Sequence, residues 1–234
     1  MCGRFTQSKS LGEYQERFGF SGEPVAFRPR FNLAPGQEAL AVLAGEGGRQ
    51  GEMLRWGLAP SWAQDERVGY KMINARAETV ADKPAFRGPF RRSRCLVPVD
   101  GFFEWAPAPG GKQPFFLARQ DREPFALAGL WDQWTGPKGE KLRSFTIVTT
   151  SANSLVEPIH PRMPVMLQPQ DEGRWLDMGA SPEQLAGLLR PYPAQDMEAH
   201  AVSRRVNSPV NEGPELIESV ATAGDLFATK GEGP

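Results

Sequence analysis

The sequence predicts an α+β fold: a mainly antiparallel sheet, curled or barrel-like, with a few peripheral helices, in a single domain. Strand-like runs recur at frequent intervals between Pro- or Gly-containing turns, while long helical patterns are few. The 234 residues show no repeat and no dividing linker, and a chain of this length can bury a sizeable core. We expect one domain over residues 1–220 and a flexible C-terminal tail over 221–234.

The first third of the chain predicts a helix and a hairpin. Apolar residues share one face of a helix over Leu11–Phe18. An Arg/Pro-rich loop, FRPRFNLAPG, follows. Two strands over 37–44 and 52–58 then flank the glycine-rich turn GEGGRQG, which is typical of a hairpin. The segment NARAETVAD predicts a short helix.

Strands dominate the remainder. Four strand candidates are parted by Pro/Gly turns: RCLVPVDGFFEW, KQPFFLARQ, PFALAGLWDQW and LRSFTIVTT. Near the C-terminus, Ser181 can cap a helix that has Pro182 at its first position and Gln184 closing a capping box. The run EAHAVSRRV predicts a final strand.

Composition excludes several functional classes. The net charge is −1, so any nucleic-acid surface must be a local concentration of arginine. The two cysteines, Cys2 and Cys95, indicate neither a disulfide framework nor a zinc site, and no cofactor or metal motif is present. No segment has signal-peptide character or the roughly 20 apolar residues of a membrane span. We expect a cytoplasmic monomer, without a membrane partner, in which Cys2 remains a thiol.

Cys2 stands where loss of Met1 would expose it as the first residue. Its α-amine and thiol would then share one carbon framework, and such a 1,2-aminothiol captures an aldehyde first as an imine and then as a five-membered thiazolidine. Ring closure is intramolecular and therefore fast. The alternative is that Cys2 is merely a small residue after the start methionine.

Two titratable residues have unusual neighbours. His160 lies in EPIHPRMPV, where prolines on both sides stiffen the backbone and aim an imidazole that titrates near neutrality. Glu104 follows two phenylalanines and precedes Trp105, and burial there would raise the pKa of its carboxyl. A packed or surface histidine and an outward-facing glutamate are the simpler alternatives.

Several further residues could contact DNA, although each also has a purely structural explanation. Asn74 can bond a sugar oxygen and Arg76 a phosphate, or they can be a helix cap and a solvated side chain. Arg4 and Arg162 each lie two residues after a candidate reactive residue. The cluster RGPFRRSR suits a nucleic-acid backbone or is a solvated loop. We expect the tryptophans at positions 56, 62 and 105 to be core residues more often than base-stacking platforms.

In combination these segments resemble one family. The order MCGRF, WGL-x-P-x-W, INARAET, CLVPVDGFFEW, VTTSAN, H-x-RMP and VS-x-x-VN strongly resembles the SOS-response-associated peptidases, also called abasic-site processing proteins. The matches run from Met1 to about Asn211. The resemblance implies that Met1 is removed by autoprocessing or by an aminopeptidase. It also implies that Cys2 traps the aldehyde of an abasic site as a thiazolidine DNA–protein crosslink, which shields the lesion.

The resemblance also assigns roles to individual residues. It implies that Cys2 is the nucleophile, that Asn74 orients the sugar, and that Glu104 and His160 transfer protons. It implies a DNA-binding set formed by Arg4, Arg76, Trp105, Thr149, Ser151 and Arg162. The partner it implies is single-stranded DNA with an abasic site, including single-strand/duplex junctions, in the cytoplasm or on the nucleoid. The family often has Tyr before the glutamate, whereas this chain has Phe103, which puts a phenol hydrogen bond in doubt.

Two other functions fit the same residues. One is a cysteine peptidase or N-terminal-nucleophile amidohydrolase, in which Cys2 attacks an amide with His160 or its own amine as base. The other is a non-catalytic module that reads modified DNA through arginine contacts. A binder releases DNA on denaturation, whereas a crosslinker retains it.

Overall fold

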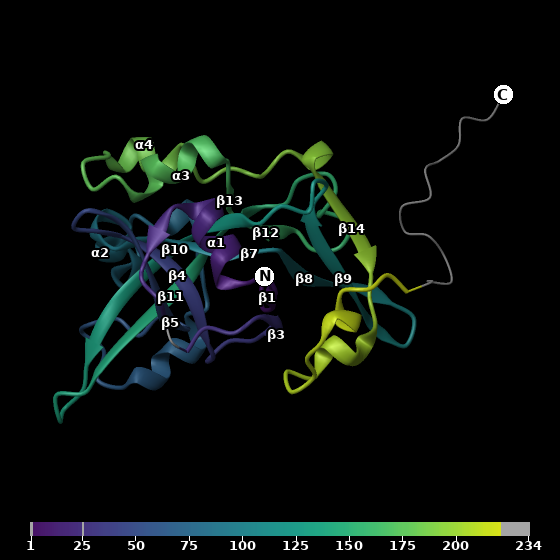
Figure 1. The fold of residues 1–234 in the computed structure, drawn as a ribbon, viewed down its shortest axis with the longest axis horizontal. Helices are drawn as coiled ribbons and strands as arrows, with labels where there is room; N and C mark the ends of the chain where they lie inside the picture. Colours follow the sequence, from purple (N-terminus) through teal and green to yellow (C-terminus); the bar gives the residue numbers. More distant parts are fainter. Residues whose placement is uncertain (1, 25, 221–234) are drawn as a thin grey trace.

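The computed structural model describes residues 2–24 and 26–220, so the predicted tail at 221–234 lies outside the described residues. The predicted fold class is confirmed: two sheets, mostly antiparallel, form one α+β domain with a few helices on its periphery (Figure 1).

The larger sheet contains a closed five-stranded barrel. Neighbouring strands follow the order β11-β10-β7-β4-β5 in antiparallel pairs, and β5 returns to β11 in a parallel pairing at Ser144↔Arg55 and Phe145↔Trp56. The barrel strands are β4 (Glu38–Gly45), β5 (Gly48–Trp56), β7 (Arg94–Val99), β10 (Phe125–Thr135) and β11 (Lys141–Ser151). Short strands extend its edges: β2 (Phe20–Ser21), β6 (Asn74–Arg76), β12 (Arg162–Pro164) and β13 (Met166–Leu167). The predicted hairpin is confirmed as β4 and β5.

The second sheet has the order β14-β9-β8-β1-β3. Its strands are β1 (Phe5–Gln7), β3 (Arg30–Leu33), β8 (Gly101–Ala108), β9 (Gly111–Arg119) and β14 (Met197–Ala201). In Figure 1, β1 lies between the barrel and strands β8 and β9. The N-terminal strand therefore joins the two halves of the molecule.

The segment RCLVPVDGFFEW is two strands rather than the single strand expected. The chain bends at Asp100 and passes from β7 in the barrel to β8 in the second sheet. The backbone N–H of Ser8 and the hydroxyl of Tyr14 both donate to the Asp100 carboxylate. These bonds hold the bend, and a bend that depends on distant partners leaves no local signal.

Helices cover the outside of the barrel. The α-helices are α1 (Leu11–Phe18), α2 (Pro84–Arg92), α3 (Pro169–Leu176) and α4 (Pro182–Ala186), and short 3-10 helices span Glu66–Lys71, Ala77–Thr79, Ala194–Asp196, Arg204–Asn207 and Pro214–Leu216. Figure 1 shows α3 and α4 along one side of the barrel. The predictions of α1 and of the Ser181 capping box are confirmed. In the described part of the chain, none of the helices has the length and hydropathy of a membrane span.

Three local predictions were wrong in part. NARAETVAD is not a helix: its first three residues form β6, which pairs with Ile147–Thr149 of β11, and a 3-10 turn follows. Sheet pairing here outweighs helix propensity. RGPFRRSR lies largely in α2, which has Pro84 in its first turn, rather than in a loop. In EAHAVSRRV the strand ends at Ala201, because the chain turns into the 3-10 helix that begins at Arg204.

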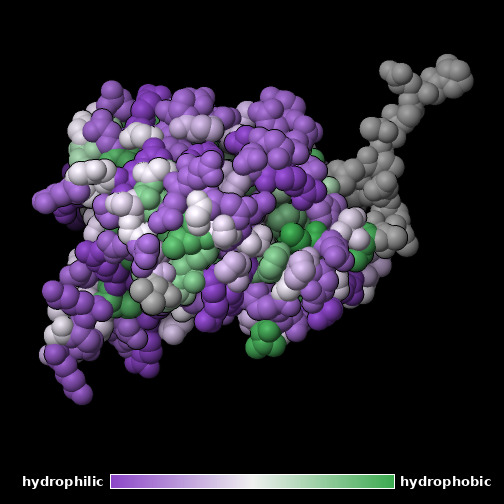
Figure 2. Space-filling view, viewed as in Figure 1, coloured by the Kyte–Doolittle hydropathy of each residue, from purple (hydrophilic) through white to green (hydrophobic). Residues whose placement is uncertain are grey.

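The core extends across both sheets. Its largest cluster includes both Cys2 and Cys95, together with aromatic residues from the barrel and the second sheet. Trp56 is buried as expected, with 1% of its surface exposed, whereas Trp62 is 63% exposed and is not a core residue. Figure 2 shows a largely hydrophilic face on which hydrophobic residues form small separate patches.

Candidate functional site

Cys2 and Asn74 are in direct contact although 72 residues separate them. The Asn74 side chain, on β6, donates from Nδ2 to the backbone oxygen of Cys2 at 2.8 Å. Its Oδ1 is buried and has no hydrogen-bond partner within residues 2–24 and 26–220. Cys2 itself is fully buried. Asn74 thus fixes the backbone at Cys2 and retains one unused acceptor.

Glu104 lies next to the start of β1. Strands β1 and β8 pair in antiparallel register at Phe5↔Phe102, and the backbone N–H of Phe103 donates to the oxygen of Arg4 at 2.9 Å. Glu104 is 2% exposed, and burial raises the pKa of its carboxyl against the opposing effect of the His160 charge. Burial, aided by the negative charge of Glu104, also raises the pKa of the Cys2 thiol. The thiol is therefore protonated at neutral pH and needs a base to become a nucleophile.

His160 closes a turn that leads into β12. Its backbone N–H donates to the oxygen of Val156 at 2.9 Å, and its ring Nδ1 lies 3.0 Å from both the backbone nitrogen and the oxygen of Arg162. The backbone of Arg162 therefore orients the imidazole through Nδ1.

Glu104 and His160 line one pocket of about 460 Å³, which we call the Glu104 pocket. Its other lining residues are Arg4, Trp105, Lys112 and Asn207. Cys2 and Asn74 lie beside this pocket but do not line it. The arrangement combines a carboxylate, an imidazole and three cationic or polar side chains, which suits proton transfer on an anionic ligand.

Arg4 and Trp105 are held by other parts of the site. Arg4 donates from Nη1 to Asn32 Oδ1 at 2.7 Å and to the oxygen of Val206 at 2.9 Å, while burial lowers the pKa of its guanidinium. Trp105 donates from Nε1 to Asn207 Oδ1 at 2.8 Å. The segment around 206–207 therefore forms one wall of the pocket.

The other predicted DNA-binding residues form a second group at the end of β11. Arg76 on β6 lies opposite Thr149, and Arg162 on β12 lies opposite Ser151. Arg76 and Ser151 are exposed, whereas Thr149 is fully buried. Arg162 is already engaged with a residue that sequence reasoning missed, Glu78.

The Arg162 guanidinium forms a bidentate pair with Glu78, with nitrogen–oxygen distances of 2.9 and 3.0 Å. It also donates to the backbone oxygen of Thr149 at 2.6 Å. Any DNA phosphate must therefore compete with the Glu78 carboxylate for this arginine. The pairing is long-range, since 84 residues separate the partners, and no local pattern predicts it.

Sequence reasoning also missed two lining residues of the Glu104 pocket. Asn207 is the final residue of the motif VS-x-x-VN, a motif from which no role for it was predicted. Lys112 lies on β9, directly opposite Pro107 of the neighbouring strand β8. Within the described part of the chain, no group of three or more His, Cys, Asp or Glu residues is placed to hold a metal ion.

The fold and the pocket define a class: a one-domain α+β protein with a cysteine near its N-terminus beside a carboxylate–imidazole pocket. The sequence model of the SOS response associated peptidase (SRAP) family matches residues 1–209. The chain therefore belongs to this family.

Relatives match over most of their length. The chain is 46% identical over 227 residues to the abasic site processing protein YoqW of Bacillus subtilis, covering 94% of this chain and 100% of that protein. It is 31% identical to the abasic site processing protein YedK of Escherichia coli, with the same coverage. A crystal structure of a protein from Bacteroides thetaiotaomicron superposes with a TM-score of 0.86 at 27% identity, covering 94% of this chain and 100% of that one.

Proposed function

We propose that this protein recognises abasic sites in single-stranded DNA and bonds covalently to them through Cys2 after Met1 is removed. The observation that carries the proposal is the contact of Asn74 with Cys2, beside a pocket that holds Glu104 and His160. The names of the relatives, abasic site processing proteins, support the same substrate.

Removal of Met1 is the first step. While Met1 is attached, the Cys2 nitrogen is an amide and cannot condense with an aldehyde. The Cys2 thiol can add to the Met1 carbonyl, so that the C–N bond breaks, a thioester forms and the Cys2 amine is released. Water then hydrolyses the thioester and frees methionine together with the thiol.

Crosslinking follows from the aminothiol. The Cys2 amine condenses with the open-chain aldehyde of the abasic sugar, giving an imine and one water. The sulfur then bonds to the imine carbon, and the thiol proton passes to nitrogen, which closes a thiazolidine. The adduct thus has the mass of protein plus DNA minus one water.

Glu104 and His160 are the groups placed to move these protons. A carboxyl whose pKa is raised by burial keeps its proton to a higher pH than an exposed one, which suits the protonation of the departing hydroxyl and the reopening of the ring in slow reversal. His160 is oriented through Nδ1, so we assign proton exchange to Nε2. Asn74 keeps a buried acceptor, Oδ1, that can receive a hydrogen bond from a sugar hydroxyl.

The DNA backbone is proposed to run from the Glu104 pocket along the end of β11. Arg4 and Trp105 line the pocket, and Arg76 and Ser151 are exposed along the path. Arg162 joins the path when a phosphate replaces Glu78, and buried Thr149 acts by holding Arg162. We further propose that single-strand/duplex junctions bind, that the protein acts as a cofactor-free monomer in the cytoplasm or on the nucleoid, and that the crosslink shields the lesion.

Intact-mass spectrometry tests the proposal. The purified protein should lack Met1, and incubation with an abasic single strand should give a denaturation-resistant adduct at the mass stated above. A strand carrying a tetrahydrofuran in place of the abasic sugar has no aldehyde and should give none. Turnover of a generic peptide without any DNA adduct would instead establish the peptidase, and dissociation on denaturation would establish a non-covalent reader.

A further inference from the structure

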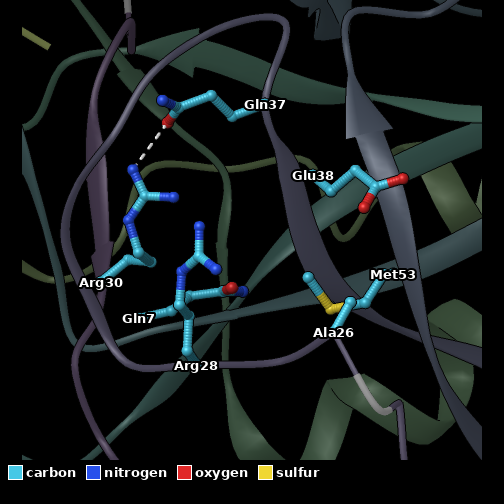
Figure 3. A pocket seen from close by; sticks show the side chains of 7 residues that line it. All are labelled: Gln7, Ala26, Arg28, Arg30, Gln37, Glu38 and Met53. Carbon is cyan, nitrogen blue, oxygen red and sulfur yellow. Dashed lines mark hydrogen bonds between the residues drawn. The ribbon is translucent and has the colours of Figure 1, made fainter. Parts of the chain in front are cut away.

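A second cleft lies on either side of Arg28 and Arg30, in the Arg/Pro-rich loop to which the proposed function assigns no role. One part, of about 320 Å³, is lined by both arginines together with Gln7 and Gln37 (Figure 3). The other part, of about 530 Å³, shares the two arginines and Gln37. We call the two parts together the Arg28 cleft.

Arg30 is fixed in place within this cleft. It donates from Nε to Glu212 Oε1 at 2.5 Å and from Nη2 to Gln37 Oε1 at 3.2 Å. Glu212 also accepts from the backbone N–H of Phe31 at 2.9 Å, and Gln37 from that of Ala34 at 3.0 Å. Glu212 therefore neutralises Arg30, and the amide nitrogen of Gln37 remains as a donor.

Arg28 supplies the uncompensated charge. It is exposed, and no acidic side chain within residues 2–24 and 26–220 pairs with it. Figure 3 shows both guanidinium groups extending toward Gln37 on the same wall, while Glu38 lies across the cleft with its carboxylate directed away from them. The wall at Arg28 therefore presents N–H donors and one net positive charge, which suits an anion.

Apolar side chains continue the same surface. Pro29, Phe31, Pro209 and Val210 line the larger part, and Val210 is 83% exposed. A ligand with a charged group and a flat or apolar group fits such a wall. A nucleotide has both, since its phosphate is anionic and its base has an apolar face.

Two segments of the chain connect residues of the cleft with residues at the reactive site. Asn207 lines the Glu104 pocket, and the chain from it leads directly to Pro209 and Val210 in the cleft. On the other side, Gln7 and Cys2 are five residues apart at the start of the chain, a span of at most about 17 Å. Successive nucleotides along one strand of B-form DNA are about 3.4 Å apart, so the span corresponds to about five nucleotides or fewer.

We propose that the Arg28 cleft binds a backbone phosphate of the DNA flanking the abasic nucleotide, within about five nucleotides of it. Arg28 and the amide of Gln37 donate to the phosphate, while the Pro209–Val210 wall supports the adjoining nucleoside. This assignment rests on the proposed function, because that function places DNA at the neighbouring Glu104 pocket.

Binding of tetrahydrofuran DNA measures the contact without covalent trapping. Two lengths of single strand are compared, one with a single nucleotide on each side of the tetrahydrofuran and one with ten. Arg28→Ala should weaken binding of the long strand by about tenfold and lower the slope of its log–log salt dependence by about 0.7. The short strand should bind Arg28→Ala and the native protein with equal affinity. Lys138→Ala removes one exposed charge at the tip of the β10–β11 hairpin and should change neither the affinity for the long strand nor its salt dependence.

Neutral methylphosphonate linkages then locate the phosphate. Replacing one phosphate within five nucleotides of the tetrahydrofuran should abolish the difference between native protein and Arg28→Ala. Native affinity of Arg28→Ala for the long strand, or an equal loss on the short strand, overturns the proposal and leaves the cleft to a different ligand such as an acidic peptide. The proposed function is tested separately: it fails if the native protein forms no adduct with a short strand that carries a true abasic aldehyde.

Discussion

The surroundings of Cys2 and of Cys95 differ chemically, although both thiols are fully buried. Burial raises the pKa of each. Only the Cys2 thiol has a carboxylate, Glu104, that raises its pKa further, and the side chain that holds the Cys2 backbone oxygen, Asn74, retains an unused acceptor. Burial alone therefore makes a thiol inert, and the neighbouring groups decide whether it can be activated.

Cys95 is enclosed by the barrel. Its strand, β7, lies between β4 and β10, and a Cβ added at Gly129 on β10 would lie 2.6 Å from its sulfur. Its backbone oxygen accepts from Trp175 Nε1 at 3.0 Å. The Cys95 sulfur is thus packed closely against β10, whereas the Cys2 segment borders a pocket of about 460 Å³.

The largest expected effect separates the two cysteines. Cys2→Ala should abolish the DNA adduct, because no other aminothiol is available, while Cys95→Ala should form the adduct at close to the native rate. Intact mass after incubation with an abasic strand measures both variants. Loss of the adduct in a folded Cys95→Ala protein would contradict the contrast drawn between the two sites.

The next largest effect concerns Glu104. Glu104→Gln is nearly isosteric but cannot exchange a proton, so crosslink formation and exchange should slow by about 100-fold or more while affinity for tetrahydrofuran DNA stays native. Single-turnover adduct formation and exchange against a second labelled strand provide the two rates. Faster release of the crosslink by this variant would remove Glu104 from the reversal step.

The sequence was sufficient for the parts of this fold that depend on local patterns. The α1 helix, the β4–β5 hairpin and the Ser181 cap all carry their signals within about ten residues, and each is confirmed. The bend at Asp100 was missed because Ser8 and Tyr14, which hold it, lie some 90 residues away. Barrel closure through β5 and β11 is likewise a long-range pairing.

The candidate site, like the fold, was predictable from the sequence only in part. The order of the motifs predicted that these residues act together, and in the structure Glu104 and His160 line one pocket beside Cys2 and Asn74. The competition of Glu78 for Arg162 was not predictable, because the Glu78 carboxylate is an ordinary surface residue in sequence terms. For Trp62 the prediction itself was wrong: a large aromatic side chain is usually buried, but this one is exposed.

A moderate effect is expected on stability and its pH dependence. Because the pKa of Glu104 is raised in the folded protein, the unfolded chain loses this proton first as pH rises above the ordinary value of 4.5. The folded state then holds more protons, so stability falls with rising pH across that window. A glutamine at this position has no charge to bury, so Glu104→Gln should be more stable than the native protein by about 1 kcal/mol at pH 8.

Urea unfolding at several pH values measures this difference. The advantage of Glu104→Gln should shrink as pH falls and vanish below 4.5, where the native carboxyl is protonated in both states. Cys95→Ala serves as the contrast: it leaves a small void in the barrel, so it should lower stability by about 1–2 kcal/mol with no dependence on pH between 4 and 7. A pH-independent gain for Glu104→Gln would show that its carboxyl is not destabilised by burial.

The smallest expected effect concerns the Arg162–Glu78 pair at the end of β11 and its contribution to DNA binding. Arg162→Ala should flatten the salt dependence of single-strand binding by about 0.7. Glu78→Gln should act in the opposite direction, raising affinity about two- to threefold, because a neutral amide competes less with phosphate for the guanidinium. Glu52→Gln is the control, since Glu52 forms a single ion-paired hydrogen bond with Arg143 on the barrel surface. If Glu78→Gln instead weakens binding, Glu78 positions Arg162 for the phosphate rather than competing with it, and the bidentate pair becomes part of the binding surface.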